Sequence, residues 1–104
     1  MGKVLVIGSR EIEFSEEIQE TIYFDNVVAV LYRKDKEIPN NVIFFNFKGK
    51  QLYTINDIVK AKVQRGYNHI EKKNDSILIA ECEIGIIYEI DVEKKEVLNK
   101  TFVR

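Results

Sequence analysis

The fold class of this chain is decided by residues 18–32, which read IQETIYFDNVVAVLY. Both halves of this stretch are rich in β-branched and aromatic residues, which favour strands. They meet at Asp25-Asn26, a pair that tolerates the left-handed backbone of a tight turn. The run Val27–Leu31 has no polar face, so we expect it near the centre of a sheet with both faces covered. The stretch therefore predicts an antiparallel hairpin whose second strand is central.

Similar apolar runs separated by turn residues recur along the chain at intervals of about ten residues, as is typical of all-β domains. Before the opening stretch, strands at 4–7 and 10–14 flank Gly8-Ser9, a turn that needs a positive φ at its first residue. After it, hairpins are predicted over 42–55, 67–81 and 84–103. We predict a single all-β domain spanning residues 1–104, with nine or ten strands in consecutive antiparallel hairpins that form a curled sheet or a sandwich.

Helix is expected at only one place. Asn56 is a suitable N-cap, and Ile58, Val59 and Val63 share one side of a short helix that would run from about residue 57 to Gln64. Gly66 is expected to follow its end. At most one helix of about two turns is therefore predicted.

The core is predicted from the least polar runs. Their central positions are expected to be buried, because a strand with no polar residue needs cover on both faces. These positions are Val28, Val30, Phe44, Ile79, Ile86 and Leu98.

Composition limits the class of protein. The chain has 104 residues, of which 45% are hydrophobic, with one cysteine and a formal net charge of −1. This is enough for one hydrophobic core, and a single cysteine forms no internal disulfide. No apolar run approaches the ~20 residues that cross a bilayer, and the net charge gives no overall attraction to an anionic membrane or to nucleic acid. We expect a cytoplasmic protein that binds no membrane, and its oligomeric state stays open.

A weak internal repeat is present. Residues 42–53 align with residues 86–98, with Asn46 on Asp91 and one gap. Both segments resemble the inner hairpin of a blade in quinoprotein-like β-propellers, although Asn46 replaces Asp, Tyr53 replaces Trp and Lys95 replaces the turn Gly. A closed propeller takes about four blades or more, and this chain holds two such hairpins. The resemblance implies hairpins that stack as an open sheet or sandwich, or that are completed by another copy of the chain.

Few residues are candidates for catalysis or metal binding. His69 has no Cys or second His nearby to complete a zinc site, so a surface or structural role is expected. Cys82 has an acid on either side, which disfavours the reactive thiolate. The pairs Glu11/Glu13 and Glu81/Glu83 would each project from one strand face, and paired carboxylates occur in glycosidases, but acids commonly alternate on solvated strands. We predict no catalytic residue, no metal ligand and no cofactor.

Charge segregation is the most informative feature. No Lys or Arg lies between Arg10 and Arg33 or between Lys73 and Lys94, and each span holds six acids. One interpretation is that acidic and basic strands pair across a sheet. The other is that an acidic face docks a basic protein, with the complementary potential setting rate and specificity. The candidate partner-binding residues are Glu11, Glu13, Glu16, Glu17, Glu20, Asp25, Asp75, Glu81, Glu83, Glu89 and Asp91.

Basic blocks lie between the acidic ones. The second of them, together with Tyr67 and His69, offers a surface for RNA, but the net charge and the flanking acids argue against nucleic acid as a partner. The basic blocks contain Arg33, Lys34, Lys36, Lys48 and Lys50, and then Lys60, Lys62, Arg65, Lys72 and Lys73.

In size, all-β pattern, lack of catalytic motifs and acidic patterning, the chain resembles the small bacterial immunity proteins of polymorphic and contact-dependent inhibition toxin systems. This resemblance is one of profile, so it transfers no residues. It implies a non-catalytic protein that binds a cognate basic toxin domain and neutralises it by charge-complementary occlusion. Two alternatives stay open: a ligand-binding or enzymatic β-domain, and a structural homo-oligomer.

Overall fold

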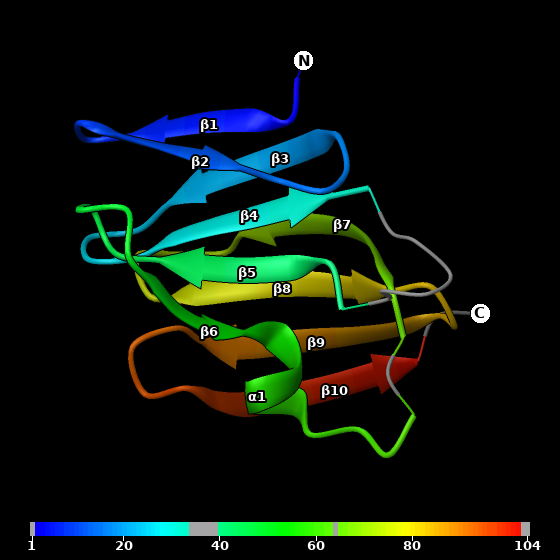
Figure 1. The fold of residues 1–104 in the computed structure, drawn as a ribbon. Helices are drawn as coiled ribbons and strands as arrows, with labels where there is room; N and C mark the ends of the chain where they lie inside the picture. The colour runs from blue at the N-terminus through cyan, green and yellow to red at the C-terminus, as the bar shows by residue number, and fades with distance from the viewer. Residues whose placement is uncertain (1, 34–39, 64, 103–104) are drawn as a thin grey trace.

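A computed structural model describes residues 2–33, 40–63 and 65–102. Within them, ten strands form three antiparallel sheets (Figure 1), which confirms the predicted all-β class and the order of hairpins. One sheet is the hairpin β1 (Val4–Ile7) and β2 (Arg10–Glu13). The second is β3 (Ile18–Tyr23), β4 (Val28–Tyr32), β5 (Val42–Phe45) and β6 (Gln51–Thr54). The third is β7 (Tyr67–Lys72), β8 (Ile77–Cys82), β9 (Ile86–Asp91) and β10 (Glu96–Phe102).

Two clusters of buried side chains show that the sheets stack in three layers, with β3–β6 in the middle. Ala29 and Leu31 of β4 pack in a cluster that includes residues of β7, β8 and β9, so the two four-stranded sheets form a sandwich. Val28 and Val30 point the other way, into a cluster with Ile7 and other residues of the β1–β2 hairpin. Every residue of β4 is buried, which confirms that this strand is central and covered on both faces.

Two of the six predicted core positions are wrong. Val28, Val30, Phe44 and Ile86 are buried, but Ile79 is only half-buried and Leu98 is 48% exposed. Ile79 points outward from β8, whose alternate residues fill the core. Leu98 lies at a bulge in β10, an edge strand whose residues are all exposed. The physical reason in both cases is that an apolar run does not reveal which of its residues face the core.

The β1–β2, β3–β4, β5–β6, β7–β8 and β9–β10 turns gather at one end of the molecule, on the left of Figure 1. Gly8, in the β1–β2 turn, has the predicted positive φ of 62°, and a Cβ there would lie 2.9 Å from the carbonyl oxygen of Phe47 in the β5–β6 turn. Asn26 in the β3–β4 turn donates to Glu93 in the β9–β10 turn at 3.3 Å. A backbone hydrogen bond joins the β7–β8 and β9–β10 turns. The turns of different hairpins therefore contact one another at this end of the molecule.

The helix α1 (Ile55–Val59) is shorter than predicted. Its N-cap is Thr54 and not Asn56, and the Thr54 backbone N–H donates to a carboxylate oxygen of Asp57 at 2.8 Å. Lys60 adopts a left-handed φ of 54°, which ends the helix well before Gly66. Gln64, the predicted end, lies outside the described residues.

The two aligned hairpins, β5–β6 and β9–β10, have turns that are held in a similar way. The side-chain oxygens of Asn46 and Asp91 each accept hydrogen bonds from two backbone N–H groups of the turns that follow them. Gly49 and Lys95 then take positive φ angles of 83° and 57°. Lys95 therefore occupies the position expected for a turn glycine, as the alignment predicted.

Asn41 joins the two large sheets and is the only buried polar side chain among the residues described. Its amide nitrogen donates to the carbonyl of Tyr32 at 2.7 Å and to that of Tyr67 at 3.0 Å. Its side-chain oxygen accepts from the Tyr67 backbone N–H at 2.8 Å. One side chain thus satisfies backbone groups at the end of β4 and the start of β7, which buried polar groups require.

Candidate functional site

Four of the eleven predicted partner-binding acids are engaged inside the molecule. The first is Glu20 of β3, which lies across from β7. One carboxylate oxygen is 2.6 Å from Nδ1 of His69, and the other accepts from the backbone N–H of Ile70 at 3.1 Å. Glu20 therefore bridges the edges of the two large sheets.

The His69 pKa is raised above its ordinary value, chiefly because its ring hydrogen-bonds to Glu20. Burial opposes this effect, while the nearby charges of Glu20, Glu71 and Glu81 add to it. The protonated imidazole is thus favoured by the fold. His69 lies on the surface, as predicted, and serves as a cross-sheet contact.

Replacing Glu20 by Gln should destabilise the protein more at acidic than at alkaline pH. A raised pKa in the folded state gives stability that is complete below the unfolded value of 6.5 and is lost as the pH rises through the folded value. Both side chains are partly exposed, so the effect should stay below about 1 kcal/mol. Urea unfolding near pH 5.5 and pH 8.5, on either side of the histidine range, measures it. Glu17→Gln, at an exposed neighbouring acid, is the control; an equal pH dependence in both variants would contradict the assignment.

Glu83 does not share a strand face with Glu81, so that predicted pair is wrong. Strand β8 ends at Cys82, and Glu83 lies in the following turn. Its carboxylate accepts from the backbone N–H of Gly66 at 2.7 Å. The chain thus uses Glu83 to tie the β8–β9 turn to the segment before β7, while Glu81 stays on the outer face of β8.

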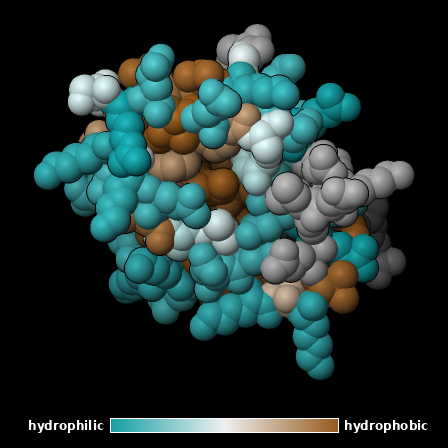
Figure 2. Space-filling view, viewed as in Figure 1, coloured by the Kyte–Doolittle hydropathy of each residue, from teal (hydrophilic) through white to brown (hydrophobic). Residues whose placement is uncertain are grey.

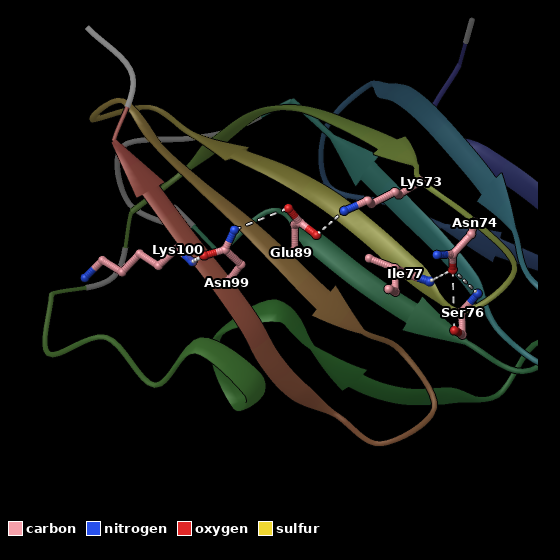
Figure 3. Close-up of polar contacts among 7 residues, drawn as sticks. All are labelled: Lys73, Asn74, Ser76, Ile77, Glu89, Asn99 and Lys100. Atoms are coloured by element: carbon pink, nitrogen blue, oxygen red, sulfur yellow. Dashed lines mark hydrogen bonds and ion pairs between the residues drawn. The ribbon is translucent and has the colours of Figure 1, made fainter.

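Glu89 and Asp91 of β9 are also engaged, and Figure 3 shows the contacts of Glu89. Glu89 accepts from the Lys73 ammonium at 2.6 Å and from the Asn99 amide at 3.5 Å, and the Lys73 hydrogen bond lowers the pKa of Glu89. The Asp91 carboxylate accepts hydrogen bonds from two backbone N–H groups of the β9–β10 turn. The Asn74 side-chain oxygen does the same in the β7–β8 turn. On this sheet, one ion pair thus joins an acid of β9 to the basic residue that follows β7, with β8 between them.

The other seven acids make no side-chain hydrogen bond or ion pair with any described residue. Two of them, Glu11 and Glu13, point outward from β2, because Ile12 between them packs inward. They are cross-strand neighbours of Val6 and Val4, which are 55% and 50% exposed. The remainder are Glu16 and Glu17 before β3, Asp25 and Asp75 in turns, and Glu81 on β8.

The outer face of the β1–β2 hairpin, made of Val4, Val6, Glu11 and Glu13, is therefore the candidate binding surface. Figure 2 shows apolar side chains reaching the surface over this hairpin, among hydrophilic ones. The fold brings the Glu11/Glu13 pair together as predicted. The adjoining valines were missed as part of a surface, because a β-rich run gives no sign of which residues stay uncovered.

Other chemistry is limited in the described part of the chain. Cys82 is a free and buried thiol. Within residues 2–33, 40–63 and 65–102, no three His, Cys, Asp or Glu side chains cluster as metal ligands. The single helix found there is too short to cross a membrane.

Comparison with known proteins gives one match. A family model described as "Domain of unknown function (DUF7957)" matches residues 1–102. No curated protein matches the chain. Because the matched segment includes every strand of the three layers, the chain belongs to the DUF7957 family.

Proposed function

We propose that this protein is a non-catalytic binding module that docks a basic protein through the outer face of the β1–β2 hairpin. The observation that carries the proposal is the distribution of internal contacts among the acids. Glu11 and Glu13 form no ion pair with a described residue, whereas Glu20, Glu83, Glu89 and Asp91 are held by internal donors. A carboxylate without an internal partner is available to a cationic one.

The valines support the same surface. Protein interfaces combine an apolar centre with polar groups around it, and an alternation of Val and Glu across two strands provides both in a small area. The Val4–Glu13 and Val6–Glu11 pairs place the two types side by side. Arg10, the cation next to Glu11 in the chain, instead packs its side chain against Gly49 in the β5–β6 turn.

The partner we propose is a toxin domain, and the protein is its cytoplasmic immunity protein. This rests on the resemblance to immunity proteins described above and on the free acidic surface. Binding would neutralise the toxin by covering its active site or its substrate surface. Complementary charge would give fast and selective association.

The test is charge reversal at the hairpin. We place the toxin domain in the product of the neighbouring reading frame, which is the probe used. We expect Glu11→Lys with Glu13→Lys to weaken binding to it by at least about a hundredfold, because two charge pairs become repulsive. Folding should be preserved, since both side chains are exposed. Affinity and association rate are measured by surface binding kinetics from low salt to about 150 mM, where the Debye length is ~8 Å.

The matched control is Asp75→Lys with Glu96→Lys, which changes the net charge equally at exposed sites outside the hairpin. It should bind as tightly as the parent protein. Equal binding by both double variants would refute the hairpin surface. A complete lack of binding between the parent protein and the neighbouring gene product would refute the immunity role.

A further inference from the structure

A pocket of about 300 Å³ opens between the segment that follows α1 and the inner face of the β7–β10 sheet. Its floor includes the buried residues Tyr67, Cys82 and Tyr88. This volume lies at the lower end of the range of small-molecule sites, about 300–1,000 Å³. The pocket is on the far side of the middle sheet from the β1–β2 hairpin, so it is separate from the proposed docking surface.

The rim of the pocket is cationic. Lys62, Arg65 and Lys100 line it, and no Asp or Glu does, although the chain as a whole has slightly more acids than bases. None of the three forms an ion pair with a described residue. Glu83 is hydrogen-bonded to Gly66, the residue after Arg65, and its carboxylate is occupied by the Gly66 N–H. The Lys100 ammonium does lie 5.5 Å from the centre of the Phe102 ring. Three cations without an ion-pair partner among the described residues still surround one opening, which favours an anion.

The walls also hold unused hydrogen-bond donors. The amide nitrogen of Asn56 is buried and has no partner among the described residues. The hydroxyls of Tyr67 and Tyr88 make no hydrogen bond within the described structure either. Burial raises the pKa of both tyrosines, so both hydroxyls stay protonated and able to donate. Buried donors are normally satisfied, so the unpartnered Asn56 amide nitrogen in the wall of this pocket needs an explanation.

We infer that this pocket binds a small amphipathic anion, with its apolar or aromatic part against the tyrosine floor and its acidic head at the Lys62, Arg65 and Lys100 rim. Two aromatic rings 6.3 Å apart, those of Tyr67 and Tyr88, offer stacking surface for the apolar part. The cations supply charge-assisted hydrogen bonds to the head.

A pair of fluorescent probes tests this inference. Anilinonaphthalene sulfonate carries an aromatic body and an anionic head, and N-phenylnaphthylamine has the same kind of body without the charge. We expect saturable binding of the sulfonate to the folded protein and weaker binding of the neutral dye. Arg65→Gln with Lys100→Gln should weaken sulfonate binding by about tenfold or more, because charge-assisted hydrogen bonds are lost, and should leave the neutral dye unaffected.

Two controls separate a rim effect from a general one. Lys48→Gln with Lys94→Gln removes the same charge at exposed turn positions and should change nothing. Val63 lines the rim and is 61% exposed, so Val63→Glu and Val63→Lys should both fold, and only the Glu variant should weaken sulfonate binding. Equal affinity for both dyes, equal loss in the control variant, or no saturable binding to the parent protein would overturn the inference.

Discussion

Replacing Val30 by Asp should leave the protein largely unfolded at neutral pH. Val30 is fully buried at the centre of β4 and packs in the cluster between the middle sheet and the β1–β2 hairpin. A carboxylate there would have no partner, and this type of defect costs at least about 4 kcal/mol, close to the whole stability of many small domains. Far-ultraviolet circular dichroism with urea titration measures the loss.

Leu98→Asp is the matched control, because it makes a similar apolar-to-acid change in β10, where the side chain is 48% exposed. It should change the free energy of unfolding by no more than about 1 kcal/mol. If Val30→Asp unfolds at the same urea concentration as Leu98→Asp, then β4 is not covered on both faces and the three-layer arrangement is wrong.

The second large effect is expected at Asn41. Asn41→Ala would leave the carbonyls of Tyr32 and Tyr67 and the Tyr67 N–H buried without these partners. Each unsatisfied buried group costs about 1–3 kcal/mol, so we expect a loss of at least about 3 kcal/mol, measured as a fall in the free energy of unfolding. Asn41→Asp keeps the acceptor for the Tyr67 N–H but places a carboxylate against two carbonyl oxygens.

The Asp variant should therefore be at least as unstable as the Ala variant at neutral pH and recover part of its stability in acid, where a protonated carboxyl can donate one hydrogen bond. Asn40→Ala, at the preceding residue, is the control. Its amide contacts Thr54 in a partly buried setting, so the loss should be clearly smaller. Equal losses at the two positions would contradict the assignment of Asn41 as the inter-sheet link.

The strands and turns were predictable because their signals are local. The positive φ of Gly8 and the central place of β4 each follow from residues within one hairpin. The equivalence of Asn46 and Asp91 follows from the alignment of two hairpins, each with its own turn hydrogen bonds. The core was less predictable. In the run Ile77–Ala80 nothing polar marks the outer face, and Ile79 proved to point outward.

The acidic surface was predictable only in part, because whether an acid is free depends on contacts between distant segments. The donors that occupy Glu20 come from β7, at positions 49 and 50 residues away in the chain. Glu83 is occupied by Gly66, 17 residues away. Charge patterning identified both acids as candidate binding residues, and no local signal in the sequence could have excluded them. Glu11 and Glu13 stayed free because their strand has solvent on its outer side.

In the part of the chain that the structure describes, every strand forms its backbone ladder only with strands adjacent to it in the chain. Each four-stranded sheet is therefore encoded by one uninterrupted piece of sequence, and the two pieces meet between Val59, where α1 ends, and Tyr67, where β7 begins. A break in this connection would sever no ladder. The halves would be held by apolar packing and by side-chain hydrogen bonds such as those of Asn41 and Glu20. This makes the molecule suited to reconstitution from two fragments, with late docking of the two preformed sheets as the step that completes folding.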